Sequence, residues 1–113
     1  MRIEKLVPQP RNRVYFNLTS FKLVPKQAGC YVLATFKNKI LYIGLSDNLH
    51  KRFQQHLENP EKTNQTADGK AAWFYFIAYN PKNLLELERT WINHFMALHG
   101  RLPILNKMNS PVI

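Results

Sequence analysis

The stretch that most constrains the fold is residues 72–79, Ala-Trp-Phe-Tyr-Phe-Ile-Ala-Tyr, which is apolar on both alternating sets of positions. Alternate residues of a β-strand face opposite sides of its sheet, so this strand needs an apolar cover on both faces. A chain of 113 residues has room for one such core. The stretch therefore predicts a sheet with helices packed against it.

A second pair of strands precedes this stretch. Residues 31–36 and 40–43 are rich in β-forming residues and are separated by a turn-like Lys-Asn-Lys, which predicts a hairpin. Gly44 is expected to end the second strand.

Two helices are predicted around the apolar strand. Ser46-Asp47 can cap a helix from about residue 47 to 57. Asn80-Pro81 is a typical helix start, and Gly100 is expected to stop that helix after about residue 99. The order of elements predicts an α+β fold with a small antiparallel sheet.

Two segments are predicted to be loops, the first ten or so residues and residues 58–70. The second is almost wholly polar and contains a proline and a glycine, so we expect a mobile excursion.

The charge of the chain indicates its partner. Sixteen Lys and Arg against seven Asp and Glu give a net charge of +9, and such a field attracts polyanions such as nucleic acid. A merely basic soluble protein, or one that touches anionic membranes, is the alternative. Residues 1–26 carry six basic groups and one acidic group, interleaved with aromatic residues. This pattern suits a surface that follows a nucleic-acid strand, and Arg11 and Arg13 are candidate substrate contacts.

The single cysteine, Cys30, cannot form an internal disulfide, and neither a signal peptide nor a long apolar run is evident. We therefore expect a cytoplasmic protein without a membrane partner. One cysteine and four scattered histidines do not provide the ligand spacing of a zinc site.

The second predicted helix carries a carboxylate in an apolar stripe. On a helical wheel Glu88 shares a face with Leu84, Trp91 and Phe95, whereas Glu86 falls on the opposite side. A carboxylate removed from water protonates, pairs with a base or binds a cation. The alternatives are a buried pair, or a slight rotation that lets Glu88 reach solvent.

The first predicted helix has a related anomaly, because Arg52 and His56 lie along the margin of a face formed with Leu49 and Phe53. A guanidinium there needs an anion, either Glu88 or a phosphate. It can also extend its head to water, and His56 alone is more often a structural residue than a catalytic one.

The hairpin residues bring these features together. Gly29-Cys30-Tyr31, ten residues and then Tyr42-Ile43-Gly44 resemble the signature of the GIY-YIG nuclease superfamily, and Arg52 follows Tyr42 by ten residues, as the family's catalytic arginine does. Glu88 and Asn106 match the family's metal-binding glutamate and terminal asparagine. The resemblance spans roughly residues 25–107 and implies a single nuclease domain over residues 25–113, preceded by a basic extension over residues 1–24.

The resemblance implies a three-stranded antiparallel sheet flanked by helices, and one Mg²⁺ or Mn²⁺ ion held by Glu88. Arg52 would neutralise the charge on the phosphate, and Asn106 would order the site and close its floor. Lys51 and Gly44 are further candidate substrate contacts. Leu45 departs from the pattern, because repair relatives often have a phosphate-binding lysine after the signature.

By the same resemblance Tyr31 is the general base, its phenol made more acidic by nearby positive charge. Tyr42 would hydrogen-bond the phosphate or the attacking water. His56 lies where relatives often carry a residue that contacts the base or the phosphate, and it is the competing base.

The function implied is a divalent-metal-dependent endonuclease, acting on DNA rather than RNA. A catalytically silent nucleic-acid-binding module using the same groove is one alternative, and a protein whose basic face binds an acidic partner is another. No reader motif is evident, so specificity would come from loops, a protein partner or a homodimer.

Overall fold

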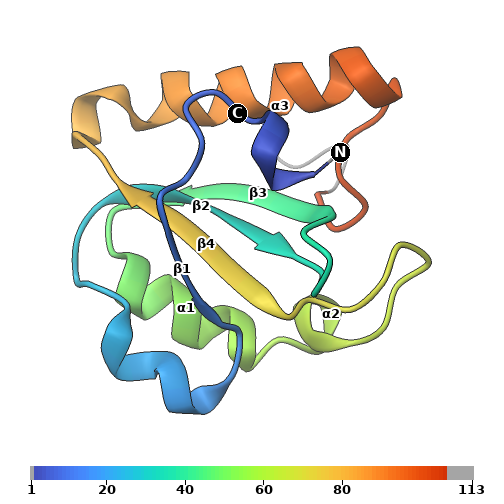
Figure 1. The fold of residues 1–113 in the computed structure, drawn as a ribbon. Coiled ribbons are helices and arrows are strands. Elements are labelled where there is room, and N and C mark those ends of the chain that lie inside the picture. Colours follow the sequence, from blue (N-terminus) through green and yellow to red (C-terminus); the bar gives the residue numbers. More distant parts are fainter. Residues whose placement is uncertain (1, 107–113) are drawn as a thin grey trace.

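A computed structural model describes residues 2–106 of the chain, which fold around a four-stranded antiparallel sheet. The strand order is β1-β4-β2-β3, formed by β1 (Asn12–Tyr15), β2 (Gly29–Ala34), β3 (Ile40–Ser46) and β4 (Trp73–Ala78). Helix α3 (Leu84–His99) lies across one face, and α1 (Leu49–Leu57) lies under the other beside the short α2 (Pro60–Thr63) (Figure 1). The described residues also form three 3-10 helices, η1 (Ile3–Lys5), η2 (Leu18–Leu23) and η3 (Pro81–Asn83).

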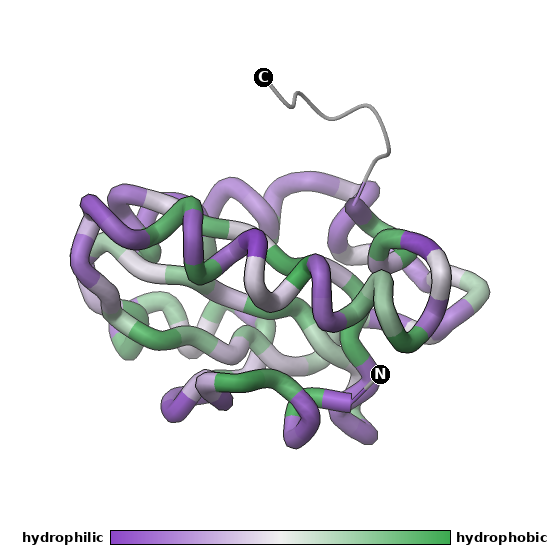
Figure 2. The backbone as a smooth tube through the Cα atoms, turned by 90° about the horizontal axis from the view of Figure 1, so that it is seen from above, coloured by the Kyte–Doolittle hydropathy of each residue, from purple (hydrophilic) through white to green (hydrophobic). Residues whose placement is uncertain are grey.

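The apolar strand has the double cover that its sequence predicts. On one face, Phe74 and Phe76 pack against Leu49 and Phe53 of α1. On the other face, Trp73 and Tyr75 pack in the cluster that contains Leu87 and Trp91 of α3. Hydrophobic segments accordingly lie along the strands, and hydrophilic ones at the surrounding turns (Figure 2). The α+β class is confirmed.

The prediction of three strands is wrong, because β1 adds a fourth at the edge beside β4. Asn12 pairs with Phe76 and Tyr15 pairs with Trp73. None of the four β1 residues is fully buried, so this edge strand lacks the apolar alternation by which a sequence reveals a strand.

The amino-terminal segment is built into the same core. Ile3 and Leu6 are each 1% exposed, η1 occupies part of the expected loop, and Trp91 of α3 donates to the carbonyl of Pro8 at 3.0 Å. The division into an extension and a domain at residue 24 stays a prediction, although residues on both sides share one core.

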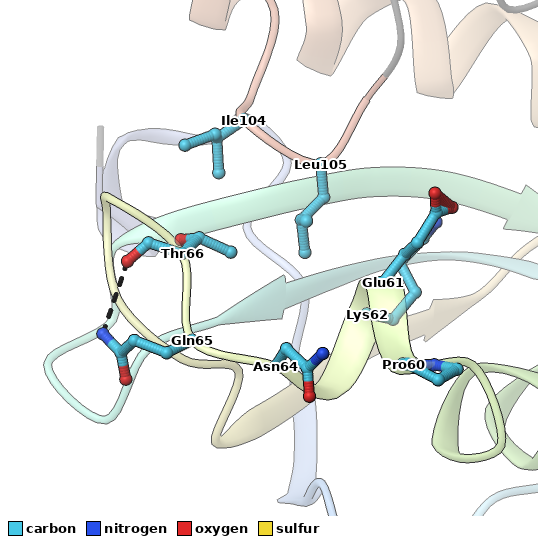
Figure 3. Close-up of a pocket in the computed structure, with 8 residues that line it drawn as sticks. All are labelled: Pro60, Glu61, Lys62, Asn64, Gln65, Thr66, Ile104 and Leu105. Atoms are coloured by element: carbon cyan, nitrogen blue, oxygen red, sulfur yellow. Dashed lines mark hydrogen bonds between the residues drawn. The ribbon is translucent and has the colours of Figure 1, made fainter.

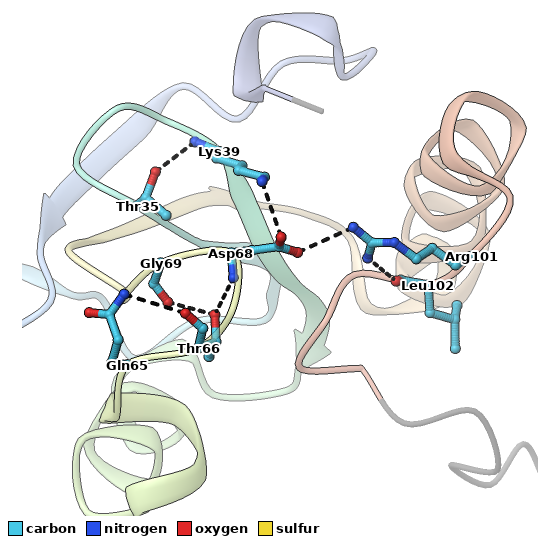
Figure 4. A network of polar contacts seen from close by, with 8 residues as sticks. All are labelled: Thr35, Lys39, Gln65, Thr66, Asp68, Gly69, Arg101 and Leu102. Carbon is cyan, nitrogen blue, oxygen red and sulfur yellow. Dashed lines mark hydrogen bonds and ion pairs between the residues drawn. The ribbon is translucent and has the colours of Figure 1, made fainter.

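The polar segment 58–70 is folded, contrary to the predicted loop. It contains α2 and a bridge between Thr66 and Gly69. The Asp68 carboxylate ties this segment to Lys39 of the β2–β3 hairpin at 3.1 Å and to Arg101 at 3.2 Å (Figure 4). Gly69 has φ +121°, and a Cβ there would lie 2.7 Å from Thr35, so the turn requires glycine.

The start of α1 and the end of β3 differ from the predictions by one or two residues. Asn48 rather than Ser46 or Asp47 caps α1, since its side chain accepts from the Lys51 amide at 3.1 Å. Strand β3 continues past Gly44 to Ser46. Gly100 ends α3 in the left-handed conformation, as predicted. No helix within residues 2–106 is both long and apolar enough to cross a bilayer.

Candidate active site

The two tyrosines of the signature lie on the α1 face of the sheet, held there by the hairpin register. Tyr31 pairs with Gly44, and Leu33 with Tyr42, so all four face the same side. A Cβ on Gly44 would lie 2.6 Å from the Tyr31 hydroxyl and 2.9 Å from the Tyr42 ring. The glycine therefore leaves room for the Tyr31 ring, and the two ring centroids are 6.0 Å apart.

Tyr31 and His56 form a buried hydrogen-bonded pair. The Tyr31 hydroxyl oxygen lies 2.6 Å from Nε2 of His56, and the side chains are 0% and 7% exposed. Burial lowers the pKa of His56 to about 3, helped by the charges of Lys62 and Arg52. His56 is therefore neutral near pH 7. The tautomer that carries its proton on Nδ1 accepts from the Tyr31 hydroxyl, and the other tautomer donates to it.

The electrostatics of Tyr31 differ from the sequence expectation. Burial raises the pKa of Tyr31 well above its ordinary value, and the opposing effect of Arg52 is smaller. Burial likewise raises the pKa of Tyr42, which Tyr31 and Arg52 partly offset. Arg52 acts on the pKa of Tyr31 in the expected direction, but burial outweighs it in the metal-free protein. The role of Tyr31 as general base stays a prediction.

Arg52 supplies a half-buried cation within electrostatic reach of both tyrosines and His56. Its Nε donates to Oε1 of Gln55 at 3.0 Å. Among residues 2–106 it makes no ion pair with a carboxylate, so the structural Arg52–Glu88 pair is not formed. This guanidinium is available for an anion such as phosphate.

Asn106 holds the free edge of β3 beside the tyrosines. Its Oδ1 accepts from the Ile43 amide and its Nδ2 donates to the Ile43 carbonyl, both at 2.9 Å. Leu105 adds a hydrogen bond to the Leu41 carbonyl, also at 2.9 Å. The segment thus fixes the backbone between Tyr42 and Gly44.

Glu88 lies at the margin of the apolar stripe rather than in its middle. The buried face of α3 is formed by Leu84, Leu87, Trp91 and Phe95, and Glu88 is half-buried beside it. Glu86 is exposed, as predicted. Burial raises the pKa of Glu88, whose charge in turn raises the pKa of Tyr42 and of Cys30. Glu88 therefore acts electrostatically on the tyrosine site although α3 covers the other sheet face.

The residues present suit a hard divalent cation held by one protein carboxylate. Within residues 2–106 no hydrogen-bond or ion-pair partner neutralises Glu88, and no group of three or more His, Cys, Asp or Glu could form an all-protein site. Mg²⁺ commonly takes one or two carboxylates and completes its shell with water and phosphate oxygens. The donor set fits that chemistry.

Lys62 joins the site although the sequence placed it in a loop. It is 8% exposed, and its ammonium lies 4.8 Å from the centroid of the Tyr42 ring. The available signal was Asn59-Pro60, since Asn59 caps α2 with a proline in its first turn. The same pair at Asn80-Pro81 predicted the start of the long helix, but it begins the 3-10 helix η3, and α3 starts at Leu84.

The remaining candidate contacts lie apart from the tyrosines. Lys51 is exposed on α1. Arg13 belongs to β1, the opposite edge of the sheet from β3, and its guanidinium lies 3.9 Å from the Trp73 ring centroid. Arg11 is exposed just before β1. Their roles in substrate binding stay predictions.

The fold and this site define a catalytic class. A family model described as the GIY-YIG catalytic domain matches residues 27–101, and the chain belongs to the GIY-YIG nuclease superfamily. Among curated relatives, UvrABC system protein C of Mycoplasma genitalium is 32% identical over 91 residues, covering 79% of this chain but 15% of that protein. The protein of the same name from Aster yellows witches'-broom phytoplasma is 34% identical over 77 residues, covering 66% of this chain and 13% of that protein. The chain thus spans a small part of the length of these relatives.

Proposed function

We propose that this protein is an endonuclease that hydrolyses phosphodiester bonds with one divalent cation, Mg²⁺ or Mn²⁺, and acts on DNA rather than RNA. The observation that carries the proposal is the convergence of Tyr31 and Tyr42, on one face of the hairpin, with His56 and Arg52 of α1. No carboxylate within residues 2–106 neutralises this arginine. The net charge of +9 supports a polyanionic substrate.

Glu88 would hold the cation, which when bound would polarise the phosphate and stabilise the departing oxygen. Arg52 would bind a phosphoryl oxygen and neutralise the charge that develops on it. Tyr42 would orient the phosphate or the attacking water, since its ring is only half-buried.

The general base would be Tyr31 acting together with His56. Tyr31 would accept a proton from water as its own proton passes to Nε2 of His56 across the 2.6 Å hydrogen bond. A bound phosphate counteracts the Lys62 and Arg52 charges that lower the pKa of His56, so substrate would make His56 a better acceptor.

The test is incubation of the protein with labelled single-stranded, duplex and branched DNA and with RNA, in Mg²⁺, Mn²⁺ or EDTA. We expect cleavage with either metal and none in EDTA. Glu88→Ala should abolish cleavage yet retain binding, whereas the matched control Glu86→Ala, exposed on the same helix, should cut normally. Cleavage by Glu88→Ala at the wild-type rate would refute the assignment. Binding without cutting under every condition would identify a silent binding module instead.

A cytoplasmic location and a protein partner or homodimer that supplies specificity remain parts of the proposal.

A further inference from the structure

A pocket of about 420 Å³ lies between α2, with the segment that follows it, and the turn that carries Ile104 and Leu105 (Figure 3). Ile104 and Leu105 line it with apolar surface, and Asn64, Gln65 and Thr66 line it with amide and hydroxyl groups. Leu105 also packs in the same cluster as Tyr42, so the pocket adjoins the candidate active site.

Lys62 is shared by the pocket and the active site. It lines the pocket, its ammonium lies 4.8 Å from the Tyr42 ring centroid, and its charge lowers the pKa of His56. A lysine as buried as this one, at 8% exposed, is uncommon on a short surface helix. Its charge lies where a phosphate would reach both Tyr42 and the pocket.

The lining suits a nucleobase better than a second phosphate. Flat apolar surface accepts a base plane, and amides can pair with the donors and acceptors of a base edge. The side-chain amide of Asn64 makes no hydrogen bond within residues 2–106, whereas its backbone amide donates to the Pro60 carbonyl at 3.0 Å.

We propose that this pocket binds the base of the nucleotide next to the cleaved bond, with Lys62 contacting that nucleotide's phosphate; the inference rests on the nuclease function proposed above. A base can enter only when it is unstacked and unpaired. The preferred substrate therefore carries an unpaired nucleotide beside the cleavage site.

The first experiment is a titration of the wild-type protein with the four deoxynucleoside monophosphates in EDTA, followed by NMR of the side-chain amides. The nucleotides should shift the Asn64 and Gln65 signals, and inorganic phosphate should not. Phosphate shifting both signals as strongly would reduce the pocket to an anion site, and no shift with any nucleotide would overturn the proposal.

The second experiment compares Lys62→Met, Lys62→Arg and the control Lys70→Met, which removes one exposed positive charge from the same segment. Each variant is titrated in EDTA with a duplex carrying one unpaired nucleotide and with the fully paired duplex. Lys62→Met should weaken binding of the first by about tenfold, the equivalent of one charged hydrogen bond, and lower the salt slope by about one. Lys62→Arg should restore most of the affinity, and Lys70→Met should change little.

Equal losses of binding affinity in Lys62→Met and Lys70→Met would refute the pocket's role. So would a wild-type protein that binds the paired duplex as tightly as the duplex with the unpaired nucleotide. If Lys62→Met does not fold, Asn64→Ala replaces it, and loss of nucleotide binding in that variant is the expected result. Absence of cleavage with every metal, together with intact nucleotide shifts, would remove the nuclease function and leave the pocket. Cleavage without those NMR shifts would support the nuclease function and refute the nucleotide pocket.

Discussion

Acidification from pH 7 to pH 5 should destabilise this protein chiefly through His56. The buried, neutral imidazole has a pKa of about 3 in the folded chain against 6.5 for the unperturbed group. Between these values the unfolded state binds a proton that the folded state does not, so stability falls as pH falls. The contribution is fully present above pH 6.5 and is lost progressively below it.

The magnitude follows from the width of that window. Each pH unit below 6.5 costs up to about 1.4 kcal/mol, so lowering the pH to 5 should cost about 2 kcal/mol of unfolding free energy. Small domains have on the order of 5–15 kcal/mol in total, so the loss is measurable. Glu88 opposes it, because its raised pKa makes the folded state bind a proton more readily on acidification. Asp68 contributes below this range, since its pKa is lowered from 3.8.

Urea denaturation at pH 7, 6 and 5 measures the effect, with His56→Gln as the comparison because glutamine can still accept from Tyr31. The wild-type protein should lose about 2 kcal/mol more than His56→Gln over this range. Equal losses in both proteins would refute the reasoning. A histidine NMR titration provides a direct check, in which the His56 ring signals should not titrate above pH 5.

Three other changes test separate parts of the structure. Tyr31→Phe keeps the ring stacked on Phe74, with the centroids 5.1 Å apart, so the variant should fold. It should lose about 1 kcal/mol of stability and cleave the substrate about 10²-fold or more slowly. Near-normal turnover would assign the general base to His56 instead. Asp68→Asn removes two ion pairs and should cost about 1 kcal/mol at pH 7. That difference should vanish as pH falls below 3.8, where the ordinary aspartate protonates, so an equal cost at acidic pH would contradict the ion-pair account. Replacing Arg11 and Arg13 with glutamine should weaken nucleic-acid binding and lower the salt slope by up to about two. Turnover at saturating substrate should survive, because β1 lies at the far edge of the sheet from the tyrosines; an unchanged slope would place these arginines away from the substrate.

Local pattern was sufficient wherever a residue's role depends on its near neighbours along the chain. The apolar run of β4 required cover on both faces, and the structure provides it. The spacing of the signature put Tyr31 and Tyr42 in one hairpin, whose register then places them on one face. Gly100 marked the helix end because the left-handed cap is a local property of the backbone.

Local pattern failed at the edge strand β1 and in the polar segment 58–70. Strand β1 exists because β4 offers it a partner, and its own residues are largely exposed. The segment 58–70 is ordered through Asp68, whose partners Lys39 and Arg101 lie far from it along the chain. The polar composition of this segment predicted a loop. Composition carries no information on ion pairs with residues distant along the chain, so it could not reveal that the segment is ordered.

The sequence by itself determined the family, the class of fold and the set of residues available for chemistry. Tertiary structure alone decided how those residues behave: Tyr31 is buried in a hydrogen bond with His56, and that burial raises its pKa more than Arg52 lowers it, and Lys62 lies over Tyr42. The physical reason is that burial depends on what packs over a side chain from distant parts of the chain. Desolvation and the placement of charges therefore have no signature in the spacing of residues along it.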